Sequence, residues 1–100
     1  MNQQAMMRLK KMQKQMMDAQ KQLEETVFKG TAGGGMVSVE VKGTHEVVSV
    51  KIDPEALESK DDIEMIEDSI VAALNDANKK LEAESQKLLG GFGGGLGGLF

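Results

Sequence analysis

The sequence predicts an α+β fold in which a long N-terminal helix, a three-stranded antiparallel sheet and a long C-terminal helix follow one another. Three observations predict it. Apolar residues recur at helical spacing over residues 2–25 and 59–89, they alternate with polar residues over residues 36–52, and glycines separate the extended stretches. Residues 90–100 contain seven glycines, which predicts a flexible tail after a single domain of residues 1–89.

The first helix is predicted by residues 2–25, which are rich in Met, Gln, Lys, Leu and Ala, all strong helix formers. Its apolar side chains repeat at intervals of four and three residues: Ala5, Leu9, Met12, Met16, Ala19 and Leu23. We call this row the seam. Its width predicts packing against one or two partner helices and not burial on all sides. Lys10, Lys14 and Lys21 share a side of the helix away from the seam, and Arg8 and Lys11 flank them.

The middle of the chain predicts three antiparallel strands with one apolar face. Apolar residues alternate along two of them: Val37, Val39 and Val41, then Val48, Val50 and Ile52. Gly43-Thr44 between them predicts a two-residue hairpin turn of type II′, because glycine comes first. Residues 26–29 form the third predicted strand, and Gly33–Gly35 turns it back onto the second. The flanking helices are expected to cover the apolar face.

The last part of the chain opens with Asp53-Pro54, a capping residue followed by a proline, which predicts a short helical turn. A long helix is predicted to begin between Ser59 and Asp62 and to end at Gly90. Its expected buried stripe is Ile63, Ile66, Ile70, Ala73, Ala77 and Leu81, widened in the middle by Val71 and Leu74.

The composition excludes most kinds of catalytic and metal site. The chain has no Cys and a single His, so it lacks the residues for thiolate catalysis, for cysteine metal sites and for a site with two His ligands. The run Gly30–Gly35 lacks the Gly-Lys-Ser/Thr of a nucleotide-binding loop, and His45 has no nucleophile in a matching context. We therefore expect no enzyme activity, no cofactor, no metal and no small-molecule substrate.

Two further absences concern location. No stretch approaches the roughly 18 apolar residues of a membrane span. Residues 1–20 lack the apolar run of a signal peptide. The sequence therefore predicts a soluble protein of the cytoplasm without a membrane partner.

The charge of the chain is unevenly distributed. The net charge is −4, but residues 1–29 carry six basic and three acidic residues, whereas residues 53–89 carry four basic and eleven acidic ones. This asymmetry predicts a basic working surface on the N-terminal helix of an otherwise acidic body. Charge alone is equally compatible with an ordinary solvated helix face.

Several segments occur in the order and spacing of one known family: Gly33-Gly34-Gly35 leading into Val37 and Val39, then Ile52-Asp53-Pro54, then Ala72-Ala73 followed by Asn75-Asp76-Ala77, and a glycine-rich end. Over essentially its whole length the chain resembles the YbaB/EbfC family of bacterial nucleoid-associated proteins. The resemblance implies a small homodimer whose helices project as a pair of arms. It also implies binding to double-stranded DNA in the nucleoid, with an influence on DNA conformation, nucleoid organisation and gene expression.

The resemblance further implies that DNA contacts lie on the N-terminal helix and near the end of the C-terminal helix. The basic residues of these two regions are Arg8, Lys10, Lys11, Lys14, Lys21, Lys79, Lys80 and Lys87. Lys and Arg contacts with phosphates provide affinity without reading the bases, and no helix-turn-helix recognition helix is visible. Two chains of −4 would give the dimer a charge of −8, so local basic patches must provide the attraction.

A second function remains open on the sequence alone. The Met-rich seam, the acidic C-terminal helix and the Gly-Phe tail are also typical of an adaptor that binds another protein. A dimer without DNA affinity at low salt, together with a protein partner that survives nuclease treatment, would favour the adaptor.

Overall fold

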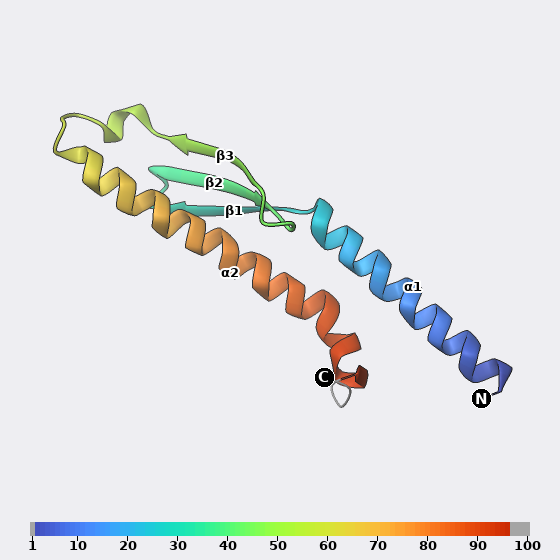
Figure 1. Ribbon diagram of the computed structural model, residues 1–100. Coiled ribbons are helices and arrows are strands. Elements are labelled where there is room, and N and C mark those ends of the chain that lie inside the picture. Colours follow the sequence, from blue (N-terminus) through green and yellow to red (C-terminus); the bar gives the residue numbers. More distant parts are fainter. Residues whose placement is uncertain (1, 97–100) are drawn as a thin grey trace.

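The computed structural model describes the backbone of residues 2–96 and the side chains of residues 2–90. Its elements are α1 (Gln3–Glu25), β1 (Val27–Ala32), β2 (Val37–Lys42), β3 (Val47–Ile52), the short 3-10 helix η1 (Pro54–Ala56) and α2 (Asp62–Leu96) (Figure 1). The three strands form one antiparallel sheet in the order β1-β2-β3. The predicted α+β fold is therefore confirmed.

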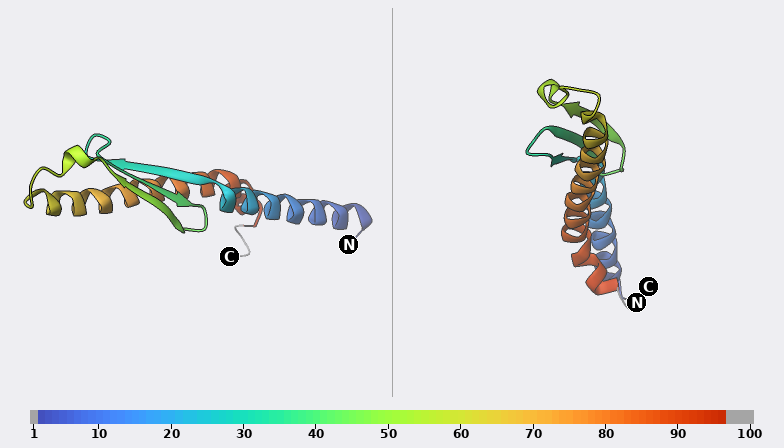
Figure 2. Two further views of the ribbon diagram at one scale, coloured as in Figure 1. Left: turned by 90° about the horizontal axis from the view of Figure 1, so that it is seen from above. Right: turned by 90° about the vertical axis from the view of Figure 1, so that its left-hand side faces the viewer.

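The molecule is strongly elongated. It measures 70 × 23 × 17 Å and has a radius of gyration of 19.4 Å, whereas a compact chain of this length has a radius of gyration of about 13 Å. α2 runs along the sheet, and α1 extends past the end of α2 as a projecting arm (Figure 2). The first turns of α1 and the first turns of α2 therefore lie at opposite poles of the molecule (Figure 1).

The core lies between α2 and two of the three strands. Three valines of β2 and three residues of α2 are fully buried together: Val37, Val39, Val41, Ala73, Ala77 and Leu81. Leu23 of α1 and Phe28 of β1 complete this cluster. Gly30 of β1 permits the close approach of α2, because a Cβ atom at this position would collide with the carbonyl oxygen of Ala73.

A single residue, Thr26, connects α1 to the sheet. Its backbone N–H donates to the carbonyl of Leu23 (3.1 Å), and its hydroxyl donates to the carbonyl of Gln22 (2.6 Å). Its own carbonyl accepts from the N–H of Gly43 (3.0 Å) in the hairpin between β2 and β3. The direction of α1 is therefore fixed by the sheet.

The turn between β1 and β2 agrees with the sequence. Gly33, Gly34 and Gly35 have positive φ angles of 63, 68 and 91°, in the region that residues with a Cβ atom rarely adopt. The N–H of Met36 donates to the carbonyl of Gly33 (3.2 Å) and closes the turn.

The prediction of a type II′ turn at Gly43-Thr44 is wrong. Residues 43–45 connect the strands, with the His45 N–H donating to the Lys42 carbonyl and the Lys42 N–H to the Glu46 carbonyl, both at 2.8 Å. His45, and not Gly43, has the positive φ angle, 73°, which is the pattern of a type I turn followed by a left-handed residue. Gly43 is needed for space instead, because a Cβ atom there would collide with the carbonyl oxygen of Leu23.

The two ends of the last helical region differ in how well the sequence predicted them. Asp53 caps η1 by accepting from the Glu55 N–H (3.0 Å), and α2 begins at Asp62, both as expected. The predicted stop at Gly90 is wrong, because α2 continues to Leu96. Gly90 does not have the positive φ angle of a helix-ending glycine, and glycine disfavours a helix interior by only about 1 kcal/mol. Residues 97–100 of the predicted flexible tail lie outside the described residues.

The helices do not cover the whole apolar face of the sheet. α2 packs on β1 and β2 but hardly contacts β3. Val48, Val50 and Ile52 therefore remain 50%, 44% and 39% exposed, against our expectation. A helix about 10 Å wide spans about two strands spaced 4.8 Å apart, so that one helix cannot cover three.

Candidate nucleic-acid interface

The structure places the five basic residues that were predicted on the N-terminal helix at exposed positions along α1. The N-cap of α1 is Asn2, whose side chain accepts from the Ala5 N–H (2.8 Å), so the helix is capped at its projecting end. Five exposed cations follow along it: Arg8, Lys10, Lys11, Lys14 and Lys21. At 1.5 Å per residue they extend over about 20 Å of the arm.

These five cations have no carboxylate partner within the described part of the chain. Its ion pairs are Lys42–Glu46 at 3.6 Å and Lys80–Asp76 at 3.4 Å, and neither involves α1. A cation without an internal partner can donate to a phosphate without first breaking a bond within the protein. The arm is therefore the part of the described chain best suited to bind a polyanion.

The seam holds the arm only at its base. Leu23 is buried, and Met16 and Ala19 are half-buried where α1 contacts α2. Leu9 and Met12 are 45% and 37% exposed. The predicted packing against a partner helix is thus found for the second half of α1, whereas the first half projects into solvent.

The three basic residues predicted on the C-terminal helix are not brought together. Lys80 faces β1, where its Nζ donates to the carbonyl of Lys29 (2.8 Å) and lies 3.4 Å from the Asp76 carboxylate. Lys79 points to another side of α2, and Lys87 lies about two turns further along. Lys80 therefore has a structural role at the sheet, and only Lys79 and Lys87 are left as cations without a described partner.

Asp76 and Lys80 together close the outer edge of β1. The Asp76 Oδ2 accepts from the Thr31 N–H (3.0 Å), while Lys80 binds the Lys29 carbonyl. The Thr31 bond lowers the pKa of Asp76 below its ordinary value, and its hydrogen bond and attraction to Lys80 and the nearby charge of Lys79 lower the pKa further. Both backbone groups would otherwise be free to pair with another strand.

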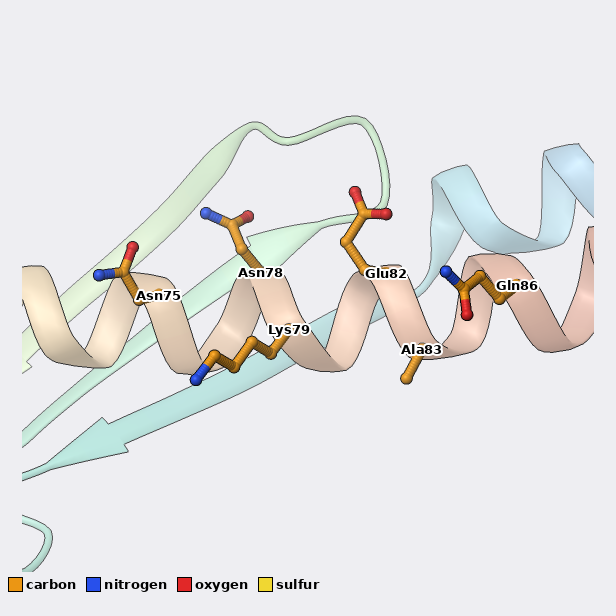
Figure 3. Close-up of a pocket in the computed structure, with 6 residues that line it drawn as sticks. All are labelled: Asn75, Asn78, Lys79, Glu82, Ala83 and Gln86. Carbon is orange, nitrogen blue, oxygen red and sulfur yellow. The ribbon is translucent and has the colours of Figure 1, made fainter.

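A shallow hollow lies on the outward face of α2 (Figure 3). Its lining consists of Asn75, Asn78, Lys79, Glu82, Ala83 and Gln86. All six residues belong to one helix, and in Figure 3 Asn78 and Glu82 point to one side while Lys79 points to the other. A hollow with one wall does not enclose a small molecule, so this face is a polar surface and not a pocket.

An apolar surface that was not predicted from the sequence lies beside β3, the outer strand that α2 leaves uncovered. We call the outer edge of β3 the open edge of the sheet. Val50 and Ile52 of β3 stand opposite the buried Val39 and Val37 and share their face of the sheet. The prediction that Ile63 and Val71 of α2 are buried is wrong, since they are 47% and 59% exposed. Both lie on the flank of the helix away from Asp76 and Lys80. We define the uncovered apolar surface as Val48, Val50, Ile52, Ile63 and Val71. Its signal in the sequence was the presence of three apolar strands with one covering helix.

The chain that forms this arm, sheet and second helix is similar to known proteins. Residues 1–96 match the YbaB/EbfC DNA-binding family. The chain belongs to this family. It is 56% identical to a nucleoid-associated protein of Lachnospira eligens over 81% of this chain and 72% of that protein. It is 41% identical to a nucleoid-associated protein of Chloroflexus aurantiacus over the full length of both.

A solved structure shows that the family fold is shared. The crystal structure of an uncharacterized protein from Helicobacter pylori matches with a TM-score of 0.70 and 31% identity, covering 92% of this chain and 97% of that one. The family match thus confirms the predicted family membership, and this structure supports the predicted fold.

The described residues include neither a membrane-spanning helix nor a cluster of metal-binding side chains. Neither of the long helices there is apolar enough over a sufficient length to cross a membrane. No group of three or more His, Asp or Glu side chains in that part of the chain is placed to hold a metal ion.

Proposed function

We propose that this protein binds double-stranded DNA as a homodimer in the bacterial nucleoid, and that the exposed cations of α1 make the contact. The observation that carries the proposal is the set of five exposed cations on a projecting arm, none of which has a carboxylate partner among the described residues. Membership of a DNA-binding family supports DNA as the partner. The names of the bacterial relatives support the nucleoid as the location.

The surface of the single chain supports the homodimer. Its accessible area is 7462 Å², whereas a folded monomer of 10.8 kDa exposes about 5,500 Å². The excess is of the size that one partner loses in a stable homodimer. The uncovered apolar surface lies beside the open edge of β3, and a second copy related by a two-fold axis would cover both. A homodimer would then carry two arms.

The charge distribution limits how such a dimer binds DNA. Its overall charge of −8 repels DNA at long range, and salt screens this repulsion beyond about 8–10 Å. Binding therefore depends on close contacts between the arm and phosphates, which give affinity with little reading of bases. An effect on DNA conformation, nucleoid organisation and gene expression would follow from holding the duplex between two fixed arms.

The decisive experiment measures the fluorescence anisotropy of a labelled duplex of about 30 base pairs at several salt concentrations. We expect the wild-type protein to bind, with log K falling by about 0.9 per log unit of salt for each phosphate neutralised. The variant Lys10→Glu/Lys11→Glu/Lys14→Glu should bind at least about a hundredfold more weakly. Three charge reversals elsewhere, Lys42→Glu/Lys51→Glu/Lys60→Glu, give the same net charge and serve as the matched control.

Each outcome of this experiment has a clear meaning. A wild-type protein that binds no DNA at low salt would contradict DNA binding and favour the adaptor function. An equal loss in both variants would show that net charge, and not the arm, controls affinity. Binding unaffected by the arm variant would move the contact to Lys79 and Lys87.

The remaining expectations from the sequence stay predictions. The family assignment favours DNA binding over the adaptor. The absence of enzyme activity, of a cofactor and of a small-molecule substrate remains a prediction from the sequence.

A further inference from the structure

The side of α1 that carries the lysines also carries methionines. Met7, Lys10, Lys14, Met17 and Lys21 follow one another at intervals of three, four, three and four residues, so they form one row along the helix. We call this row the mixed stripe. It has the same spacing as the seam but lies on the opposite side of α1, and it is about 21 Å long.

The two methionines of the mixed stripe are the most exposed large apolar side chains of the described chain. Met17 is 71% exposed and Met7 is 69% exposed. The stripe is slightly hollowed at both ends. Gln3, Met6, Met7 and Lys10 line one shallow depression, and Met17 and Lys21 line the other together with Asp18, Gln20 and Glu24. Neither Met7 nor Met17 belongs to the seam, so helix packing does not explain them.

Helix formation does not explain these methionines either. Gln, Lys and Glu have nearly the same helix propensity as Met and are soluble at exposed positions. What Met adds is an unbranched, polarisable side chain that adapts to an irregular apolar surface. The grooves of DNA offer such surfaces in thymine methyl groups and between base steps, where Met is among the side chains that insert.

The neighbours of each methionine determine what kind of surface can cover it. Met7 has Lys10 and Lys11 three and four residues later, and Met17 has Lys14 three residues before and Lys21 four residues after. Any partner that covers both methionines must also receive these cations, none of which has a carboxylate partner among the residues that the structure describes. A double-stranded nucleic acid combines negative charge and apolar groove walls in this way.

We propose that the mixed stripe contacts duplex DNA with both of its residue types, the lysines on phosphates and Met7 and Met17 in a groove, and that oxidation of these two sulfurs weakens DNA binding. The inference rests on the proposed function. A peroxide supplies the chemistry: one oxygen atom of hydrogen peroxide is transferred to the thioether sulfur, the O–O bond breaks, the sulfur loses two electrons and water leaves. The resulting sulfoxide is polar and no longer suits an apolar contact.

Three variants with confirmed helicity test the contact by anisotropy on the same duplex. Met7→Gln/Met17→Gln keeps the length and helix propensity but removes the apolar contact, so binding should weaken about tenfold with an unchanged salt slope. Met7→Leu/Met17→Leu should bind like the wild type. Met12→Leu/Met16→Leu changes the seam in the same number of positions and should also bind like the wild type.

Peroxide treatment of the same proteins, with the oxygens counted by mass spectrometry, tests the modification. The wild type and the seam variant should lose about tenfold in affinity, whereas Met7→Leu/Met17→Leu should retain its affinity. An equal loss in all three while they remain folded would place the sensitive sulfur elsewhere and overturn the inference.

Other outcomes distinguish this inference from the proposed function. Lysine-dependent binding that is unchanged in Met7→Gln/Met17→Gln would overturn the inference and leave the proposed function standing. Absence of DNA binding by the wild type at low salt would overturn both. Loss of the homodimer in Met7→Gln/Met17→Gln, measured by sedimentation, would assign the methionines to a protein contact and overturn the inference.

Discussion

The two outer edges of the sheet have opposite characters. At β1, side chains of α2 bind the outward backbone groups of Lys29 and Thr31, and the backbone of α2 lies directly against Gly30. At β3, the apolar residues are 39–50% exposed and α2 hardly reaches them. The Asp53 N–H donates to the Met36 carbonyl, so this pair of residues is hydrogen-bonded between β2 and β3. Because hydrogen-bonded and non-hydrogen-bonded pairs alternate along an antiparallel ladder, Ile52 and Val50 are in non-hydrogen-bonded pairs with β2. Their N–H and C=O groups therefore point outward.

This contrast indicates that the two edges of the sheet have different roles. An exposed strand edge is a template for pairing with another chain, and proteins usually block it. This chain blocks one edge with residues of its own and leaves the other both open and apolar. The closed edge therefore belongs to the fold of one chain, and the open edge belongs to the proposed assembly of two.

The largest effect is expected from a charge placed at the open edge. In Val50→Glu, burial of an unpaired carboxylate at the dimer contact should raise the dimer dissociation constant by at least about a hundredfold. Sedimentation equilibrium over a range of protein concentrations measures it. Lys51→Glu, the neighbouring residue on the other face of β3, is the control and should remain dimeric. A dimer of unchanged stability in Val50→Glu would separate the open edge from assembly.

A smaller effect is expected at the closed edge. In Gly30→Ala the new Cβ collides with the carbonyl oxygen of Ala73, so α2 must move away from β1 at a cost of about 1–3 kcal/mol. The melting temperature should fall by roughly 5–20 °C at a fixed protein concentration. In Gly90→Ala the new Cβ meets nothing within 4 Å, so this control should be neutral or slightly more stable. Equal melting of Gly30→Ala and wild type would show that the close approach is dispensable.

The smallest effect on the melting temperature is expected from removing the charge of Asp76, which helps to close the edge of β1. The pKa of Asp76 is lowered by the Thr31 hydrogen bond and by Lys80, so its ionised form adds stability at neutral pH. That contribution declines as the pH falls below about 4, the ordinary range of a carboxyl group, and is lost below the lowered pKa. Asp76→Asn should therefore melt slightly below wild type at neutral pH, with a difference that disappears in acid.

The control for this pH dependence is Asp68→Asn, which removes an exposed carboxylate from the same helix. Because Asp68 is not bonded to the sheet as Asp76 is, Asp68→Asn should melt like the wild type. If Asp76→Asn differed from wild type by the same amount at every pH, the bond to Thr31 and not the charge would be the stabilising part.

Local patterns made much of this fold predictable. Helical spacing predicted α1 and α2, alternation predicted β2 and β3, and three consecutive glycines predicted the first turn. The shared side of Lys10, Lys14 and Lys21 was predictable for the same reason, because residues at helical spacing lie on one face wherever the helix is placed.

The rest depended on contacts between distant residues. Asp76 and Lys80 meet strand residues 45 and 51 positions away, so the sequence alone left Lys80 among the candidate DNA contacts. Gly43 suggested a turn conformation, whereas its role is to admit the carbonyl of Leu23. The exposure of β3 followed from the width of one helix, which has to be compared with the number of apolar strands that it must cover.

The one-residue connection at Thr26 has a consequence for the assembled protein. Thr26 is bonded on one side to the last turn of α1 and on the other to the hairpin that ends in β3, so the arm cannot swing independently of that strand. In a dimer joined through β3, the spacing and angle between the two arms would be set at the contact between strands. The distance between the tips of the two arms would then depend on how the two β3 strands pair. A change of a few degrees in that pairing would produce a larger displacement at the tips, because each arm is long.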